Sequence, residues 1–288
     1  MISQLKTNFY SFIVRNWPGL MFRFQILKFH ILYGPHWYYP RIKNPRTFNE
    51  KLLNLKLTKD YSPYSNLADK YLVREWVKEK IGEQYLIPAY GVYDSAEQVP
   101  FSDFPAEYIL KPTHGSGWVI ISEKNNPEDW PGYKKKMAEW LKIDYYKTSG
   151  EAQYKNIVPR IICEHLLKPS DGVLLDFKFF CFGGKPTYVQ VDIDRHTNHT
   201  RNFYDRSWVK QDFSVCYPMT EKVVPRPAEL EEMWALATKL SEGFEFVRVD
   251  FYNVDSKIYF GEVTFHPGSG YEPFSSFEAD LNMGKLIN

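Results

Sequence analysis

The pattern of apolar residues changes near residue 106, and this change constrains the fold more than any other feature of the sequence. Before it, Thr47-Phe48-Asn49-Glu50 matches a helix-starting capping box, and residues 66–80 predict another helix that stops before Gly82. After it, seven short runs rich in β-branched and aromatic residues predict strands. The predicted strands are 108–111, 119–122, 161–166, 175–182, 187–192, 246–252 and 258–264, with a helix over 227–241. A mostly helical region followed by an α+β body is therefore expected.

Composition excludes several classes of protein. The 288 residues suggest about two domains, and 44% apolar with 25% charged residues is ordinary for a globular protein. This excludes a disordered chain and a disulfide scaffold. Three cysteines without a CxxC spacing indicate reduced thiols, and no apolar run reaches the length of a membrane span. We expect a cytoplasmic protein with no nucleic-acid partner.

Charge is distributed unevenly, although the net charge is only +1. Residues 1–49 hold seven Lys and Arg and no Asp or Glu, and eleven of the fifty aromatic residues fall in residues 1–40. Residues 1–33 predict two helices. Peripheral contact of residues 1–49 with the inner face of an anionic membrane is one explanation. Core packing, with the cations attracting an acidic substrate, is the favoured one, because Phe and Trp are spread around both helices.

Two predicted strands near the C-terminus carry the sharpest chemical signal. Arg248-x-Asp250 and Glu262-x-Thr264 flank a short turn, and a loop at 255–257 would place Asp250 opposite Glu262. Arg248 then lies opposite Thr264 on the same face, since side chains alternate along a strand. Carboxylates about 5 Å apart repel each other unless a cation lies between them, and hard oxygen ligands suit Mg²⁺. An exposed acidic hairpin balanced by Arg248 explains the spacing equally well.

A loop of small residues follows the first predicted strand. Lys111 ends that strand, and His114-Gly115-Ser116-Gly117 leads into the next one. Gly115 and Gly117 let backbone N–H groups approach an anion, and Lys111 adds a positive charge for phosphates. The loop lacks the ending of a Walker A motif, so a plain hairpin turn is the competing interpretation. Glu164, in a later apolar run, is either an edge residue facing water or an acid beside a nucleoside.

The order of these elements resembles that of the ATP-grasp ligases, and the chain is similar to the TupA-like ATP-grasp family of cell-surface polysaccharide and teichuronopeptide biosynthesis. The matching stretches are 45–52, 68–71, 111–117, 176–182 and the hairpin with its ending at 262–270. The resemblance implies an ATP-grasp fold whose two α+β subdomains clamp ATP. A helical region at 1–105 would precede a lid subdomain at 106–168 and a catalytic subdomain at 169–288.

The resemblance also implies roles for individual residues. The ATP-binding residues would be Lys111, His114, Gly115, Ser116, Gly117, Glu164, His165, Leu166 and Lys178. The ligands of two Mg²⁺ ions would be Asp250, Glu262 and Thr264, although many ATP-grasp enzymes have Asn where this chain has Thr264. Arg248 and Lys178 would be the catalytic residues. Asp69 and Lys70 match a D-K pair of the family, for which helix packing is a sufficient role.

The implied reaction joins a carboxylate to an amine through an acyl phosphate and forms ADP. The carboxylate would belong to a uronic acid of a cell-surface polysaccharide, such as a capsule, or of its precursor, and the amine to an amino acid or another amine. Residues assigned to acceptor binding are Arg195, His199, Arg201 and Ser269, with surface-loop residues as the alternative. Two other functions stay open: a glycosyltransferase using Asp192-Ile193-Asp194 as a DxD motif, and a non-catalytic nucleotide-binding protein at a membrane surface.

Overall fold

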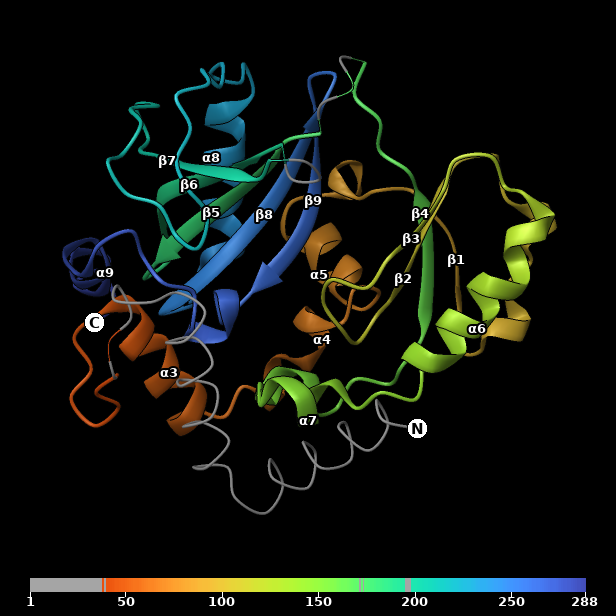
Figure 1. Ribbon diagram of the computed structural model, residues 1–288, viewed down its shortest axis with the longest axis horizontal. Helices are drawn as coiled ribbons and strands as arrows, with labels where there is room; N and C mark the ends of the chain where they lie inside the picture. The colour runs from red at the N-terminus through yellow and green to blue at the C-terminus, as the bar shows by residue number, and fades with distance from the viewer. Residues whose placement is uncertain (1–37, 39, 171, 173, 195–197) are drawn as a thin grey trace.

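The computed structural model describes residues 38, 40–170, 172, 174–194 and 198–288 (Figure 1). The two helices predicted within residues 1–33 lie outside this part of the chain. Among the described residues, no helix has both the length and the apolarity needed to cross a membrane.

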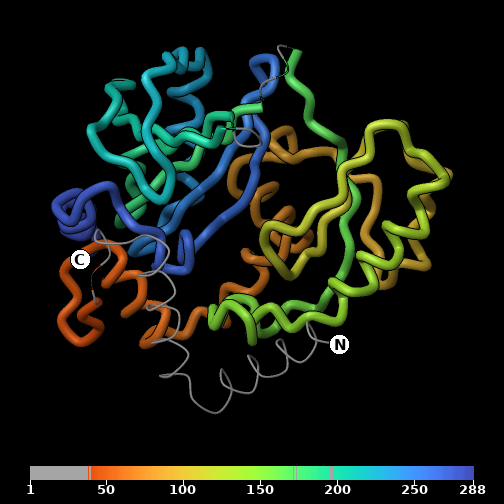
Figure 2. The backbone as a smooth tube through the Cα atoms, in the orientation of Figure 1, coloured from red at the N-terminus to blue at the C-terminus, as the bar shows by residue number. Residues whose placement is uncertain are grey.

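Two antiparallel sheets form the framework and lie side by side along the long axis of the molecule (Figures 1 and 2). The four-stranded sheet has the order β1 (Ala89–Tyr93), β4 (Ile161–His165), β2 (Tyr108–Pro112) and β3 (Ile120–Ser122). The five-stranded sheet has the order β7 (Thr200–Tyr204), β6 (Lys185–Ile193), β5 (Asp176–Phe182), β8 (Phe246–Val254) and β9 (Lys257–Thr264). The expected α+β class is confirmed.

Two of these strands lie where the sequence predicts none. β1 falls within residues 1–105, where helices are expected, and it pairs with β4. β7 falls in a polar stretch, yet all of its residues are buried, including Arg201 and Asn202. Strand propensity misses β7 because its polar side chains are buried through pairing with other polar groups rather than by being apolar.

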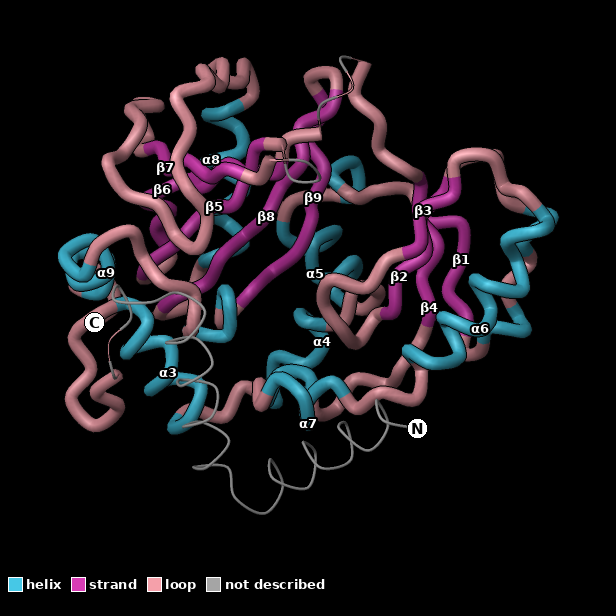
Figure 3. The backbone as a smooth tube through the Cα atoms, viewed as in Figure 1, coloured by secondary structure: helices cyan, strands magenta, loops and turns pink. Residues whose placement is uncertain are grey.

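Helices cover the sheets and connect them (Figure 3). α8 (Leu230–Ser241), which matches the helix predicted over 227–241, packs Trp234 against Phe179 of β5 with ring centroids 5.1 Å apart. α6 (Trp130–Trp140) buries Met137 in the core of the four-stranded sheet, and α7 (Tyr145–Ser149) follows it. Short 3₁₀ turns lie at Ser62–Tyr64, Glu83–Tyr85, Ala96–Gln98, Phe101–Asp103, Pro127–Asp129, Ala152–Tyr154 and Pro267–Gly270.

The predicted capping box begins α3 (Phe48–Thr58). The Thr47 hydroxyl accepts the Glu50 N–H at 3.2 Å, and the Glu50 carboxylate accepts the Thr47 N–H at 3.1 Å. α3 lies against α9 (Phe277–Gly284) so closely that a Cβ on Gly284 would come within 2.4 Å of the Arg46 carbonyl oxygen. Glycine is therefore required at this helix contact.

The helix predicted over 66–80 is wrong in one respect, because the chain forms two helices, α4 (Ser65–Ala68) and α5 (Val73–Lys80). The buried carboxylate of Asp69 accepts hydrogen bonds from the N–H groups of Tyr71 and Leu72, at 2.7 and 3.1 Å. A carboxylate can satisfy the free N–H groups at a helix start in this way. The break leaves Lys70 outside both helices.

One face of the five-stranded sheet is divided between apolar and charged side chains. Along β5, Phe180 and Phe182 pack around Phe48 of α3, whereas Asp176 and Lys178 lie on the same face farther along the strand. The aromatic end fixes the sheet against α3 and α9. The charged end contains the residues from which the candidate site is built.

Candidate active site

The β8–β9 hairpin brings four of the predicted residues together. Asp250 pairs with Glu262, and Arg248 pairs with Thr264, as the sequence predicts. The side chains of all four lie on one face of the sheet.

The turn that produces this pairing differs from the expected one. The loop predicted at 255–257 is wrong, because the turn has only residues 255–256, both with positive φ. A two-residue turn alone would place Asp250 opposite Gly261. A bulge at Gly261 shifts the register by one residue and restores the pairing of Asp250 with Glu262. The glycine fits because a Cβ there would lie only 3.1 Å from the Asp250 carbonyl oxygen.

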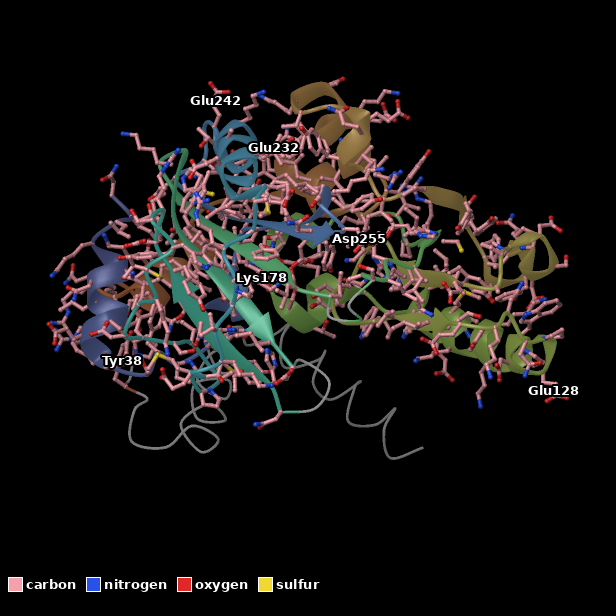
Figure 4. All side chains as sticks on the ribbon, turned by 90° about the horizontal axis from the view of Figure 1, so that it is seen from above. Tyr38, Glu128, Lys178, Glu232, Glu242 and Asp255 are labelled. Carbon is pink, nitrogen blue, oxygen red and sulfur yellow. The ribbon has the colours of Figure 1, made fainter. Side chains whose placement is uncertain are left out.

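Five charged side chains on this face form what we call the carboxylate cluster: Asp176, Lys178, Arg248, Asp250 and Glu262. Arg248 donates to both carboxylate oxygens of Asp250, each at 2.7 Å, and to Glu262 at 2.8 Å. Lys178, which lies within the sheet in Figure 4, donates to Asp250 at 2.7 Å and also to Asp176. The cation required between the two hairpin carboxylates is thus the guanidinium of Arg248.

At least two members of the carboxylate cluster keep their charges despite burial. Burial disfavours the Glu262 carboxylate, but the charges of Arg248 and Lys178 outweigh this effect and lower its pKa to about 2. Burial also opposes the Lys178 ammonium, but Asp176 and Asp250 raise its pKa above the ordinary value. Glu262 and Lys178 are therefore ionised at neutral pH, whereas burial raises the pKa of Asp250 above its ordinary value.

Carboxylate oxygens suit a hard divalent cation, but Arg248 and Lys178 already contact both oxygens of Asp250. Three carboxylates and two cations leave a net charge of 2 − 3 = −1, and the Glu262 side chain is 38% exposed. No group of three or more His, Cys, Asp or Glu in the described chain is arranged to hold a metal by itself. Asp250 and Glu262 could therefore bind Mg²⁺ if phosphate oxygens and water completed its coordination. The Thr264 hydroxyl contacts Arg248 and donates to Glu262 at 2.9 Å, so its role as a ligand stays a prediction.

A second group of charges lies at the four-stranded sheet. This cationic cluster consists of Lys70, Arg74, Lys111 and Glu164. The Glu164 carboxylate is buried and accepts from Lys111 at 2.9 Å and from Arg74 at 3.1 Å. The structure therefore brings Lys111 and Glu164 into contact across β2 and β4, and the cluster has a net charge of 3 − 1 = +2.

Lys70 is the residue that sequence reasoning underrated. Its ammonium donates to the carbonyl oxygen of Gly115. Gly115 belongs to the loop of residues 114–117, which we call the glycine loop. Burial lowers its pKa, and the charge that most opposes this effect is Glu262 of the carboxylate cluster, while Lys111 lowers it further. Lys70 thus lies within electrostatic reach of both clusters. The Asp69-Lys70 pair in the sequence pointed to this lysine. Helix packing was a sufficient explanation for the pair until the structure showed that the helix breaks at Asp69.

The glycine loop is anchored at its base. His114 is buried, with its Nε2 atom 3.1 Å from the Trp140 carbonyl oxygen at the end of α6. A Cβ on Gly115 would lie 2.8 Å from the Trp118 ring, and Gly117 has a φ of +74°. Ser116 is exposed at the tip. The loop therefore has a fixed base and a backbone that glycine alone adopts easily, whereas its contact with phosphate stays a prediction.

His165 and Leu166 follow Glu164 at the end of β4. The His165 N–H donates to the Pro88 carbonyl oxygen at 2.9 Å, and its ring lies 3.0 Å from the Tyr90 hydroxyl. Leu166 is half-buried. Their contact with adenosine stays a prediction.

The residues assigned to acceptor binding are not all placed alike. Arg195 lies outside the described residues. Arg201 is buried, donates to Asp192 at 2.6 Å and reaches Glu272 at 3.4 Å, so its charge is already balanced. His199 stacks on Tyr217 with ring centroids 3.6 Å apart. Arg201 is therefore a better candidate for positioning β6 and β7 than for contacting an acceptor.

Ser269 belongs to a buried polar network beyond the hairpin. Its hydroxyl accepts from Lys56 of α3 at 2.6 Å and donates to Glu151 at 2.9 Å. The Glu151 carboxylate also accepts from Gln153 at 2.7 Å. This network joins α3 to the segment after α7, and neither Lys56 nor Glu151 was singled out from the sequence.

The DxD motif does not present two carboxylates to one site. Asp192 forms an ion pair with Arg201, and Asp194 accepts a hydrogen bond from the Lys222 ammonium. The structure offers no observation that favours a glycosyltransferase.

A comparison with solved structures found several ligases and synthetases of low similarity. D-alanine–D-alanine ligase from Bacillus anthracis is 19% identical with a TM-score of 0.43, over 74% of this chain and 63% of that one. N5-carboxyaminoimidazole synthetase from Staphylococcus aureus is 12% identical with a TM-score of 0.42, over 69% and 44%. ATP-grasp ligase PsnB, complexed with a phosphomimetic variant of its minimal precursor, Mg and ADP, is 10% identical with a TM-score of 0.44, over 96% and 70%.

The chain spans less than two thirds of the length of the first two of these proteins. TM-scores this low carry no argument about this protein, and no curated protein matches its sequence. The profile of one family, described as TupA-like ATPgrasp, matches residues 50–288, which is most of the chain. The protein therefore belongs to the TupA-like ATP-grasp family.

Proposed function

We propose that this protein is an ATP-dependent ligase that joins a carboxylate to an amine through an acyl phosphate. Members of ATP-grasp families are ADP-forming ligases, and the family match supports the same chemistry here. A carboxylate is a poor electrophile at neutral pH because it lacks a good leaving group. Transfer of the γ-phosphoryl group to a carboxylate oxygen supplies one, namely phosphate. The amine nitrogen then attacks the acyl carbon, phosphate leaves and the amine loses a proton.

Two features of Lys70 together carry this proposal: its ammonium donates to the Gly115 carbonyl oxygen, and the charge of Glu262 in the carboxylate cluster acts on it. The cationic cluster, at +2, suits a triphosphate, and the carboxylate cluster, at −1, suits the metal that accompanies it. Because Glu262 and Lys111 both act on the Lys70 ammonium, phosphate and metal would meet at one place. Neither cluster alone would suffice for phosphoryl transfer.

In this mechanism the chain's own residues position charge rather than react covalently. Lys70 and Lys111 would hold the phosphates of ATP, with Glu164 keeping Lys111 in place. Arg248 would stabilise the negative charge that develops on the transferring group and on the tetrahedral intermediate. Mg²⁺, as one or two ions on Asp250 and Glu262, would neutralise the charge on the phosphates.

The substrate class rests on the family resemblance. We propose a uronic-acid carboxylate of a cell-surface polysaccharide or its precursor, amidated by an amino acid or another amine in the cytoplasm. Buried Arg201 does not supply an evident cation for this carboxylate. We propose Arg248 as the described cation nearest to this role, because it lies in the carboxylate cluster.

The test is a screen of ADP release over combinations of uronic acids and amines. ADP release should require both substrates, and hydroxylamine in place of the amine should trap the acyl phosphate as a hydroxamate. If the rate of ADP release were the same with and without the carboxylate, the proposal would be contradicted. Transfer of a sugar from a nucleotide sugar would instead establish a glycosyltransferase.

A further inference from the structure

Three exposed cations lie on the segment before α3, and one of them contacts an exposed aromatic ring at the start of α9. Arg41, Lys43 and Arg46 are exposed, and none of them forms an ion pair with a carboxylate of the described chain. The guanidinium of Arg46 lies over the Phe277 ring, 5.8 Å from its centroid, and Phe277 is 43% exposed. We call these four residues the basic patch.

The backbone that carries the cations is fixed from inside. The buried carboxylate of Glu50 accepts the N–H groups of Arg41 and Arg46, at 2.8 and 2.7 Å. The Asn54 amide donates to the Ile42 carbonyl oxygen at 2.8 Å. Because side chains of α3 form hydrogen bonds with these backbone groups, the segment at 41–46 is held in place. Its charged side chains are exposed to solvent.

The basic patch lies away from the candidate active site. Tyr38, whose ring packs edge-on against Phe277 with centroids 5.0 Å apart, lies at one end of the molecule in Figure 4. Lys178 lies between it and Glu128, which is at the opposite end. The three cations of the basic patch therefore lie apart from Lys178, while the other four basic residues of 1–49 lie outside the described residues, so substrate attraction by this segment stays a prediction.

The charge around the basic patch is mostly of one sign. Glu278 is exposed next to Phe277, but Lys285 is exposed at the other end of α9. The sequence before the patch extends the excess, since residues 1–49 contain seven basic and no acidic residues. Cations grouped around an exposed aromatic ring suit an interface that is anionic on its surface and apolar beneath it.

We propose that the basic patch docks on the surface of an anionic lipid bilayer. Arg41, Lys43 and Arg46 would contact lipid phosphates, and the Phe277 ring would enter the boundary between headgroups and acyl chains. Each cation near such a surface strengthens binding about fivefold, so the three together contribute about 100-fold. A soluble polyanion would satisfy the cations but would gain nothing from the exposed ring.

The test uses the full chain and co-sedimentation with vesicles of phosphatidylcholine, alone or mixed with phosphatidylglycerol. The wild type should bind only the mixed vesicles, and the triple variant R41E/K43E/R46E should lose more than about 100-fold in affinity, because it also introduces three negative charges. The matched control is K124E/K135E/K142E, which reverses three exposed lysines around α6 at the other end of the molecule. Both variants change the net charge from +1 to −5, so only position distinguishes them.

Phe277 distinguishes a lipid surface from a simple charge effect. Phe277→Ala should weaken binding to the mixed vesicles several-fold, and Phe277→Trp should restore it. The melting temperature of each Phe277 variant is the control. An unchanged value shows that the loss of binding does not come from a disturbed contact between residue 277 and Tyr38. The proposal would be overturned if the two triple variants lost the same affinity for the mixed vesicles, or if the wild type bound neutral vesicles equally well. It would also be overturned if the wild type bound dextran sulfate with the same affinity and Phe277→Ala had no effect.

Discussion

The charge of Glu262 in the carboxylate cluster acts on Lys70 of the cationic cluster, but the two clusters are built differently. In the cationic cluster the side chains of Arg74 and Lys111 are 17% and 21% exposed, and both depend on the single carboxylate of Glu164. In the carboxylate cluster the side chains of Lys178 and Asp250 are only 8% and 2% exposed. Partly exposed cations can exchange a carboxylate for a phosphate at little cost, whereas buried ion pairs stay fixed. One cluster is thus suited to receive a ligand and the other to keep its geometry.

The largest expected effect separates the clusters by stability. Lys178→Met removes the cation that Asp176 and Asp250 share at a buried site, where Arg248 still neutralises Asp250, and should lower the free energy of unfolding by about 3 kcal/mol. Lys111→Met should lower it by about 1 kcal/mol or less, because Arg74 still neutralises Glu164. Urea denaturation measures both. Equal losses would show that the two clusters do not differ in burial as described.

The next effect concerns turnover. Glu262→Gln keeps the shape of the side chain but removes a charge that Arg248 and the proposed metal share, so ADP release should fall about 100- to 1000-fold. Its dependence on Mg²⁺ should weaken as well. Glu242→Gln, a change at an exposed residue beside α8, is the control and should leave turnover unchanged. Normal ADP release from the Glu262 variant would contradict the proposal that a metal binds at this hairpin.

Acid titration distinguishes the carboxylate cluster from the contact between α3 and α9. Burial raises the pKa of Asp280, which accepts the Asn49 N–H at 3.0 Å, from 3.8 to about 6. Because folding favours its protonated form, the free energy of unfolding should fall by roughly 3 kcal/mol as pH rises from about 4 through 6. Glu262, with its pKa lowered to about 2, contributes stability that is lost only as pH falls below about 4.5.

Denaturation across this range checks the assignment. Asp280→Asn should flatten the fall above pH 4 or so and leave the loss at lower pH in place. If the profile of this variant matched that of the wild type, the titrating group would have to be sought elsewhere, for example at Asp250.

The smallest effect tests the residue that links the clusters. Lys70→Met should weaken ATP binding about tenfold, because one charge-assisted contact to phosphate is lost, and Lys70→Arg should recover part of it. Lys80→Met, at the exposed end of α5, is the control. Isothermal titration with ATP measures all three. Unchanged affinity in Lys70→Met would confine this lysine to the packing role that the sequence suggests.

Much of the site was predictable because it depends on alternation along strands. The face shared by Arg248, Asp250, Glu262 and Thr264 follows from a spacing of two residues, and the capping box at Thr47 follows from local hydrogen bonding. Even so, the predicted pairing of the hairpin carboxylates was reached through a wrong loop. The bulge at Gly261 compensated for a turn that is one residue shorter than expected.

The sequence by itself determined the class of fold, the family and the side chains that share a strand face, because these depend on patterns between near neighbours. Only the tertiary structure decided that Asp69 breaks a helix, that Lys70 reaches Gly115 and that the charge of Arg201 is balanced by Asp192 and Glu272. The contacts of Lys70 with Gly115 and of Arg201 with Glu272 join residues that are distant in the chain. The energy of a buried charge also depends on which partner lies beside it.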